Sequence, residues 1–291
     1  MSEPEHEMAV VVMAYMAPGS VISAVRSILR QVPQPEILVV NSGGGDVQRQ
    51  LQDAGIKVKV AENSRRLMPG GARNLGIHST SAPYVAFLAA DCTAEPGWVA
   101  ERLKAHHQGH AVVASALLCH QPKNPIALAA HLSLFFRRMP RVPADIALAY
   151  GNSYDRRLFE RHGQFREDMR TGEDTEFHLR LSASEQPKWW PEVKTVHVGT
   201  TSLIGFVIDQ FRRGRHSAQA WYAINQLNRN TFARGALKRI PWTVRMAMKV
   251  VEPSDRFIAM MAVPFIWVGG MAYVLGALRA NGSGVVARCD D

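Results

Sequence analysis

The sequence contains few cysteines, and their spacing gives them no obvious partners. Of its 291 residues only Cys92, Cys119 and Cys289 are cysteine, an odd number at wide intervals. This pattern excludes a disulfide framework, lacks the CxxC spacing of a structural zinc site and is typical of a reducing compartment. A chain of this length buries a core large enough to fold without disulfides. We therefore expect one large α/β domain or two small ones, exposed to the cytosol on at least one side.

Several common nucleotide and metalloprotease motifs are also missing. The sequence contains neither a Walker lysine motif nor HExxH. The glycine run SGGGD, residues 42–46, is not GxGxxG, and it follows the second predicted strand rather than the first. A dinucleotide-binding loop of the Rossmann type is therefore not expected. No internal repeat or low-complexity tract is present.

Long uncharged runs are absent except near the C-terminus. The first residues, MSEPEHE, are acidic and lack the basic n-region of a secretory signal. Residues 257–278, by contrast, contain no formal charge over 22 positions, and a bilayer-spanning helix needs about 20. Pro264 and the pair Gly269–Gly270 are tolerated in membrane helices. We predict that this segment associates with a membrane; a single anchor, a re-entrant hairpin and a buried helix are the alternatives.

The chain has an excess of positive charge, with a formal net charge of +9. Such an excess indicates an anionic partner: nucleic acid, an acidic lipid surface or phosphorylated small molecules. Much of it lies in three clusters that also contain aromatic and aliphatic residues, at 135–143, 210–216 and 236–245. These clusters are typical of a membrane face or of an RNA surface, and a solvated basic surface is the plain alternative. Because no RNP, KH or zinc motif occurs, we predict no nucleic-acid partner.

Apolar runs of strand length alternate with helical patterns over the first part of the chain. The predicted strands are residues 8–15, 35–41, 57–63 and 84–91, and the predicted helices are residues 20–31, 47–56 and 71–82. Strands that are apolar along their whole length favour a parallel sheet covered on both faces. We therefore predict an α/β fold with a Rossmann-like, mostly parallel sheet flanked by helices. Beyond about residue 110 the alternation becomes less regular.

Polar residues follow each of these predicted strands. They are Tyr15, the run from Asn41 to Asp46, the pair Glu62 and Asn63, and Asp91. In open α/β sheets ligands bind beyond the carboxyl ends of the strands. We therefore expect these side chains to gather along one edge of the sheet.

Four motifs in this order resemble glycosyltransferase family 2, the nucleotide-diphospho-sugar transferases with a GT-A fold. They are VVVMAYMAPGSVISAVRSIL, MPGGARNLGIHSTSAPYVAFLAADCTAEPGW, GNSYDRRLFERHGQFRED and GEDTEFHLRL. Each motif alone is weak, and their order and spacing carry the resemblance. It implies a GT-A glycosyltransferase domain over residues 8–215. A helical region, residues 216–291, would follow it, with the candidate anchor at 257–278.

The resemblance implies a divalent cation, Mg²⁺ or Mn²⁺, at the end of the strand 84–91. The family's strand ends in Asp-x-Asp, and here Ala89, Ala90 and Asp91 stand in its place, so the first acid is missing. Asp91 matches the position that usually contacts the metal, and His197 matches a histidine that completes the site in related enzymes. Such a cation stabilises the departing diphosphate, and hard oxygen ligands suit both ions. The alternatives are a helix N-cap for Asp91 and a structural role for His197.

The resemblance also implies a set of nucleotide contacts. Tyr15 would flank the base, and Asn41 and Ser42 would hydrogen-bond it where the family more often has two aspartates. Arg73 and Asn74 match the family's ARN helix, where an arginine forks onto phosphate or a base edge. The alternatives are core packing for Tyr15 and a surface position for Arg73. The departures at 41 and 42 leave uridine and guanosine both open.

Two further motifs concern the reaction itself. The pair Glu173 and Asp174 matches the family's catalytic acids, with Asp174 as the base that deprotonates the acceptor hydroxyl. Adjacent acids at a helix start are also an ordinary capping arrangement. Gln210, Arg213 and Gly214 resemble the Gln-x-x-Arg-Trp motif of processive polysaccharide synthases, with glycine in place of tryptophan. Processive synthesis is therefore not expected, and Arg213 would close over the diphosphate or face acidic lipid.

These expectations combine into one functional prediction. The protein is predicted to be an inverting, metal-dependent glycosyltransferase of the hexosyltransferase type. Its donor would be a nucleotide-diphospho-sugar and its acceptor a lipid-linked or other glycan at the cytoplasmic membrane face. The alternative is a catalytically inactive GT-A scaffold that lost its first metal acid and binds a nucleotide or a partner.

Overall fold

The chain builds an eight-stranded mixed sheet. The computed structural model describes residues 5–16 and 18–280. The strand order is β3-β2-β1-β4-β7-β6-β8-β5. The strands are β1 (Met8–Ala14), β2 (Glu36–Asn41), β3 (Lys59–Glu62), β4 (Tyr84–Ala89), β5 (Cys92–Ala94), β6 (Val112–Cys119), β7 (Ser153–Asp155) and β8 (Lys188–His197). Strands β3, β2, β1 and β4 are parallel to one another, as predicted. Strand β7 is antiparallel to β4 and to β6, and β5 is antiparallel to β8.

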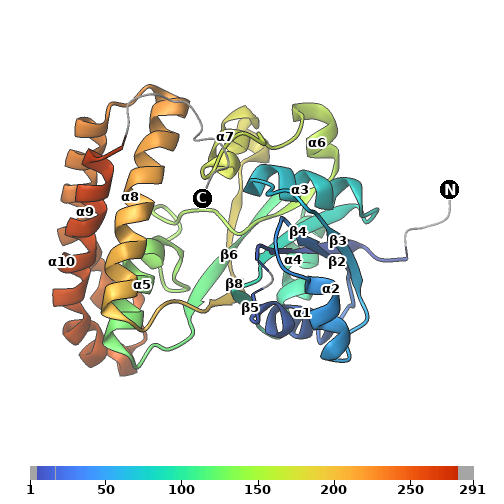
Figure 1. The fold of residues 1–291 in the computed structure, drawn as a ribbon, viewed down its shortest axis with the longest axis horizontal. Helices are drawn as coiled ribbons and strands as arrows, with labels where there is room; N and C mark the ends of the chain where they lie inside the picture. Colours follow the sequence, from blue (N-terminus) through green and yellow to red (C-terminus); the bar gives the residue numbers. More distant parts are fainter. Residues whose placement is uncertain (1–4, 17, 281–291) are drawn as a thin grey trace.

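Helices cover both faces of the sheet (Figure 1). On one face pack α1 (Val21–Leu29), α2 (Val47–Asp53) and α4 (Trp98–His107), and on the other α3 (Pro69–His78), α6 (Arg157–His162) and α7 (Glu173–Arg180). Strand β1 is buried on both sides because Val10 and Val12 alternate with Ala9 and Val11. This burial accounts for the continuous apolar run of the strand.

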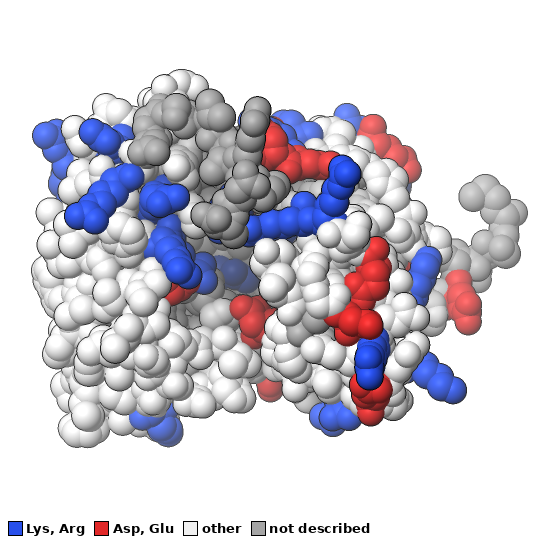
Figure 2. Space-filling view, in the orientation of Figure 1, with Lys and Arg blue, Asp and Glu red and all other residues white. Residues whose placement is uncertain are grey.

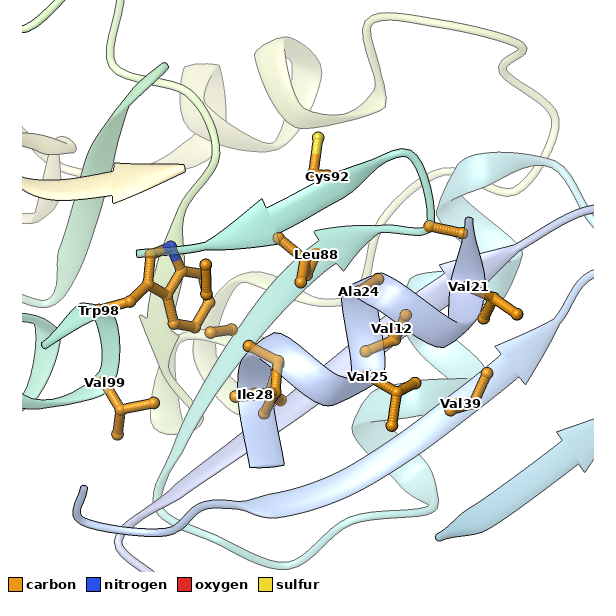
Figure 3. Packing of buried hydrophobic residues seen from close by; sticks show 14 of the residues in the cluster. Val12, Val21, Ala24, Val25, Ile28, Val39, Leu88, Cys92, Trp98 and Val99 are labelled. Carbon is orange, nitrogen blue, oxygen red and sulfur yellow. The ribbon is translucent and has the colours of Figure 1, made fainter. Parts of the chain in front are cut away.

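Helix α1 shows how a helical pattern in the sequence becomes packing. Val21, Val25 and Ile28 are fully buried and point from one face of the helix toward the sheet, where Val12 and Leu88 lie (Figure 3). Burying each such side chain stabilises the fold by about 1.5–3 kcal/mol. The helix predicted over residues 20–31 is confirmed.

A second layer of helices lies beside the sheet domain, at the left in Figure 1. It contains α5 (Pro125–Phe135), α8 (Leu203–Asn225), α9 (Arg229–Val250) and α10 (Arg256–Leu278), and the short 3₁₀ turns are η1 (Phe136–Arg138), η2 (Ala183–Glu185) and η3 (Pro253–Asp255). Ser202 caps α8 by accepting a hydrogen bond from the backbone of Gly205. The limit predicted after residue 215 therefore falls inside α8, which runs unbroken from Leu203 to Asn225. The layer also includes α5, which comes much earlier in the chain.

Helices α8 and α10 approach each other closely along their length. A Cβ atom on Gly214 would lie 2.0 Å from the carbonyl oxygen of Tyr273, and one on Gly276 would lie 2.0 Å from that of Phe211. Both distances are far below van der Waals contact, so only glycine fits at these two crossings. The contact explains Gly214 physically: a tryptophan at this position would force the two helices apart.

Helix α10 is apolar on its packed side and also on its exposed side. The region Pro253–Leu278 is long and apolar enough to cross a membrane, with a mean hydropathy of 1.9 in its best window, of which 33% is buried. Its exposed large apolar side chains recur at helical spacing: Phe257, Met260, Met261, Trp267, Val268, Met271, Leu275 and Leu278. The other side packs on α5, α8 and α9. Of the cysteines, Cys92 and Cys119 are free thiols, and Cys289 lies outside the described residues.

Candidate active site

The carboxyl ends of β1 and β2 bring the first predicted site residues together. Ser42 donates a hydrogen bond to the carbonyl of Ala14 at 2.8 Å, and Asn41 donates from Nδ2 to Glu62 at 2.7 Å and to the carbonyl of Gly44 at 3.0 Å. Both side chains are buried. Within the described chain Oδ1 of Asn41 has no partner. Asn41 and Ser42 thus shape this edge and leave one amide oxygen unused.

Tyr15 is the exposed member of this edge. Its side chain follows β1 and is 42% exposed, so it is not part of the core. The guanidinium of Arg66 lies 4.6 Å from the centroid of its ring. An exposed aromatic ring at the ligand edge offers a flat apolar surface for stacking. The predicted role of Tyr15 beside a base stays a prediction.

Asp91 and His197 meet at the opposite end of the same edge. Strand β5 pairs with β8 so that Cys92 lies opposite His197, and the backbone of Val198 donates to the carbonyl of Asp91 at 2.9 Å. Nε2 of His197 lies 3.6 Å from Oδ2 of Asp91. Burial raises the pKa of Asp91, but the hydrogen bond and charge of His197 and the Cys92 thiol outweigh it and hold the pKa below its ordinary value.

The structure removes one alternative for Asp91. The N-cap of the next helix, α4, is Gly97, so Asp91 caps no helix. The carboxylate is instead about half exposed at the strand end, whereas His197 is mostly buried. A charged, accessible carboxylate beside an imidazole is a reasonable partial ligand set for a divalent cation. Among residues 5–16 and 18–280 no group of three or more His, Cys, Asp or Glu side chains is placed to hold a metal, so a cation at Asp91 would take its further ligands from substrate or water.

Arg73 and Glu173 form a buried ion pair. Nη1 of Arg73 on α3 lies 2.6 Å from Oε1 of Glu173, the first residue of α7, and both side chains are largely buried. The guanidinium also lies over the rings of Phe87 and Phe165, at 5.5 and 5.2 Å. Burial lowers the pKa of Arg73, but the carboxylates of Glu173 and Asp174 outweigh it and raise the pKa. Arg73 therefore holds α7 in place rather than lying at the surface.

Asn74, next to Arg73, is committed to the backbone of a neighbouring loop. Its Nδ2 donates to the carbonyl of Phe165 at 2.9 Å and to Glu167 at 2.8 Å, and its Oδ1 accepts from the backbone of Phe165 at 3.1 Å. The side chain is buried. This amide fixes the loop before α7. It has no free donor left for the nucleotide contact that the sequence predicted.

Asp174 lies in a different environment from its neighbour Glu173. It lines a cavity of about 850 Å³ between the start of α7 and the helical layer. Its Oδ1 accepts a hydrogen bond from the backbone of Thr175 at 2.8 Å, and the hydroxyls of Thr175 and Tyr150 are hydrogen-bonded to each other at 2.8 Å. The two adjacent carboxylates thus differ in environment, because Glu173 forms an ion pair with Arg73 and Asp174 lines a cavity.

The cavity is strongly basic on one side. Figure 2 shows the molecule hollowed between the helical layer and the sheet domain, with Lys and Arg side chains in and above the hollow. The basic side chains that line the cavity are Arg138, Arg170, Arg212, Arg213, His216 and Arg239. They come from all three basic sequence clusters and from the loop before α7. The sequence indicated an anionic partner for these clusters but not that they meet around Asp174.

Arg138 connects the two predicted catalytic regions. Its buried guanidinium lies 5.6 Å from the ring of Phe135, and that ring lies 5.1 Å from the ring of His197. Burial lowers the pKa of Arg138 to about 10, although Cys92, Asp174 and Tyr150 act to raise it. Arg138 therefore interacts with both regions. It contacts Phe135, which packs against His197, and its charge interacts with Asp174. Sequence analysis did not single out this residue.

Gln210 and Arg213, predicted from the synthase-like motif, both line the same cavity. Nε of Arg213 lies 2.7 Å from Oδ2 of Asp209, one helical turn away, so its charge is partly neutralised. Burial and the charges of four arginines, at 170, 215, 212 and 213, lower the pKa of His216 to about 4. This wall of the cavity therefore has a positive electrostatic potential that suits phosphate groups.

Comparison with known proteins decides the family. Residues 9–153 match the family described as glycosyl transferase family 2. The chain belongs to glycosyltransferase family 2. The protein is thus a nucleotide-sugar-dependent glycosyltransferase, as predicted, and Tyr15, Arg73 and Asp91 lie in the matched segment. Asp174 and His197 lie beyond it.

Solved structures agree in fold with this family 2 enzyme. The mannosyltransferase PcManGT from Pyrobaculum calidifontis, in complex with GDP-Man and Mn²⁺, has a TM-score of 0.60 at 17% identity, over 94% of this chain and 86% of that one. S. aureus TarS 1–349 in complex with UDP-GlcNAc has a TM-score of 0.52 at 12% identity, over 92% of this chain and 91% of that one. These likenesses confirm the GT-A-type α/β fold. No curated protein sequence matches the chain.

Proposed function

We propose that this family 2 enzyme is an inverting hexosyltransferase that uses Asp174 as its base. The observation that supports the role is the contrast between two adjacent acids. Arg73 holds Glu173 at 2.6 Å in a buried pair, whereas Asp174 lines the cavity. An acid that deprotonates an acceptor hydroxyl must be within reach of the substrate, and of these two acids Asp174 is the one that lines the cavity. Glu173 acts through Arg73, as the residue that positions the start of α7.

The donor is a nucleotide-diphospho-sugar bound along the carboxyl edge of the sheet. Tyr15 offers a stacking surface for the base, and at the end of β2 the buried amide of Asn41 has an Oδ1 without a partner among the described residues. Arg213 adds positive charge for the diphosphate from α8. The geometry does not distinguish UDP-sugars from GDP-sugars, so both belong in any donor screen.

A divalent cation, Mg²⁺ or Mn²⁺, fits the Asp91 end of this edge. Asp91 supplies a charged oxygen ligand with a lowered pKa, and the adjacent His197 supplies a nitrogen. When bound, such an ion stabilises the negative charge of the leaving nucleoside diphosphate. Because Ala89 replaces the family's first acid, the diphosphate itself must contribute more of the coordination than in enzymes that keep both acids.

We place the enzyme at the cytoplasmic face of a membrane, with a lipid-linked or other glycan as acceptor. Two features support this placement. Helix α10 exposes a long stripe of large apolar side chains. The neighbouring helix α9 carries no acid, and its six cations are Arg229, Arg234, Lys238, Arg239, Arg245 and Lys249. An apolar stripe beside a cationic helix is the pattern that binds an anionic bilayer surface.

The substitution Asp174→Asn tests the catalytic assignment. Donors are first found by thermal shift with UDP-, GDP- and TDP-sugars, with and without Mn²⁺. We expect the variant to lose at least about 100-fold in transfer rate and to keep donor affinity within a few-fold, because the amide keeps the shape but cannot accept a proton. Asp168→Asn, an exposed acid paired with Arg166, is the matched control and should keep full activity. Turnover retained by the Asp174 variant would remove Asp174 from this role. Wild-type protein that binds a donor but transfers to no acceptor would favour the inactive scaffold.

A further inference from the structure

The cavity that contains Asp174 is lined by two chemically different groups of residues. One group is polar and consists of Gln210 and the basic side chains of the wall, Arg138 among them. The second group, the apolar zone, comes from α8, α9 and α10. The apolar lining residues are Ala220, Ile224, Phe232, Ala236, Ile240 and Ile266. A volume of about 850 Å³ is typical of a complete small-molecule site.

Arg138 is a cation without a counter-charge in contact. In the described part of the chain it forms no ion pair and no hydrogen bond with another residue, its Nε is buried and unpaired, and its guanidinium lies over the ring of Phe135. The guanidinium lies against Gly151, where a Cβ atom would be 2.3 Å from Nη2. Leaving a charge buried and unpaired is costly in free energy, so such a group is characteristic of a site that receives an anion. An arginine fork is well suited to phosphate.

Gln210 is a second unsatisfied polar group in the same wall. Its side chain is only 2% exposed, and Nε2 has no hydrogen-bond partner among the described residues. A buried amide donor without an acceptor is rare in native structures. The guanidinium of Arg138 and the unused amide donor of Gln210 together complement the acceptor oxygens of a phosphate group.

The apolar zone has space for a chain. Gly235 of α9 lines the cavity, and a Cβ atom there would have nothing within 4 Å. Position 235 is exposed, so the cavity is accessible at this point of the helical layer. It is the same layer that carries the apolar stripe of α10. A chain that leaves the cavity beside Gly235 would therefore emerge on the membrane-binding part of the molecule.

We infer that the acceptor is a phosphate-linked lipid: a hydroxyl-bearing headgroup joined through phosphate to an alkyl or isoprenoid chain. The phosphate binds at Arg138 and Gln210, the chain lies between α8, α9 and α10, and the hydroxyl faces Asp174. This inference rests on the proposed function because it takes Asp174 as the base. It adds the class of acceptor and the two residues that recognise its phosphate.

Three probes below their micelle concentrations separate the parts of this ligand. Decyl phosphate carries phosphate and chain, inorganic phosphate carries no chain, and decyl glucoside carries a chain and hydroxyls without phosphate. Their affinities for the full-length protein are measured by thermal unfolding, since a ligand of the folded state raises the midpoint. We expect decyl phosphate to bind at least about 10-fold more tightly than either other probe. Equal binding of decyl phosphate and inorganic phosphate overturns the lipid part. Equal binding of decyl phosphate and decyl glucoside overturns the phosphate part.

Two variants locate the site. Arg138→Met should lose at least about 10-fold in affinity for decyl phosphate without lowering the stability of the empty protein, because it removes a buried unpaired charge. A purely structural Arg138 would give the opposite stability result. Gly235→Leu should reduce decyl phosphate binding to the level of inorganic phosphate and leave inorganic phosphate binding unchanged. Asn230→Leu, at an exposed position of α9 outside the cavity, is the matched control. If Gly235→Leu has no effect, the chain does not bind in this cavity.

The outcomes also separate this inference from the proposed function. Binding of decyl phosphate is measured without turnover, and Asp174→Asn should retain it. Donor turnover with no binding of decyl phosphate would overturn the acceptor class and leave the glycosyltransferase mechanism intact. Binding of decyl phosphate by an enzyme in which Asp174→Asn is fully active would overturn the mechanism and leave the lipid site intact.

Discussion

At the scale of single residues, the environment assigns different roles to similar side chains. Arg73 and Asn74 resemble nucleotide-binding residues in the sequence, yet the fold uses one to hold Glu173 and the other to hold the backbone of Phe165. Sequence could not reveal these partners because they lie far away in the chain. Asp91 and His197, by contrast, were paired in advance by the resemblance, and the register of β5 and β8 brings them together.

The Arg73–Glu173 pair makes a stability prediction. Glu173→Gln leaves the buried guanidinium of Arg73 without a counter-charge, so we expect a loss of about 3–5 kcal/mol in the free energy of unfolding. Urea denaturation measures this as a lower midpoint at unchanged slope. The double variant Arg73→Met with Glu173→Leu removes both charges and should recover most of the loss. A single variant with wild-type stability would show that the pair is not formed in solution.

At the scale of elements, the helical layer depends on glycines that have opposite surroundings. Gly214 is enclosed by the backbone of α10, and Gly235 on α9 has open space where its side chain would be. Only Gly235 lies in the helical region predicted over residues 216–291, and the sequence does not show how the surroundings of the two glycines differ. Only the packing of α8 against α10 makes one of them essential.

Alanine substitutions at these two glycines should therefore change stability in opposite directions. Gly214→Ala forces α8 away from the Tyr273 carbonyl, and overpacking of this kind destabilises by roughly 1–3 kcal/mol or more. Gly235→Ala meets no atom and gains up to about 1 kcal/mol from helix propensity. Thermal midpoints of both variants check this. A stabilised Gly214→Ala would contradict the close crossing of α8 and α10.

Helices α9 and α10 together predict how the enzyme meets a bilayer. We expect the protein to sediment with vesicles that contain anionic lipid, and less with neutral vesicles, because the cations of α9 attract the headgroups. Replacing Trp267 and Met271 with serine should weaken sedimentation at any salt concentration. Replacing Arg245 and Lys249 with glutamine should weaken it mainly at low salt, because screening removes the charge effect. Equal binding to neutral and anionic vesicles would exclude the role of α9.

At the scale of the whole molecule, periodicity and composition predicted most of the fold. The alternating strands and helices of the first 110 residues and the parallel pairing of β1 to β4 follow from local patterns, and the structure confirms them. That a ligand binds along the carboxyl edge of these strands stays a prediction. The cavity could not be predicted. Its basic wall draws Arg138, Arg170 and Arg213 from three separate segments, and only the packing of the helical layer on the sheet domain places them around Asp174.

Buried neutral histidines predict how stability depends on pH. Burial lowers the pKa of His106 and of His178 to about 4. In the unfolded chain both titrate near 6.5, so between about pH 6.5 and 4 the unfolded state binds more protons. Stability should be fully present above that range and should fall as the pH drops through it, by on the order of 1 kcal/mol per pH unit for each ring.

Urea midpoints between pH 7.5 and 5 measure this dependence. His106 donates from Nδ1 to the carbonyl of His110 at 2.7 Å and accepts from Ser153 at 2.8 Å. The variant His106→Gln keeps polar contacts but cannot take up a proton, so its stability curve should be flatter. Identical curves for variant and wild type would show that His106 does not titrate on unfolding.

The glycine crossings between α8 and α10 have one more consequence. Because the backbones of α8 and α10 touch at Gly214 and Gly276, we expect the two helices to move as one rigid body. Helix α10 carries the exposed apolar stripe, and α8 carries Gln210 and Arg213. If α10 lies on a bilayer, we expect a tilt of α10 to shift Gln210 and Arg213 in the cavity wall with it.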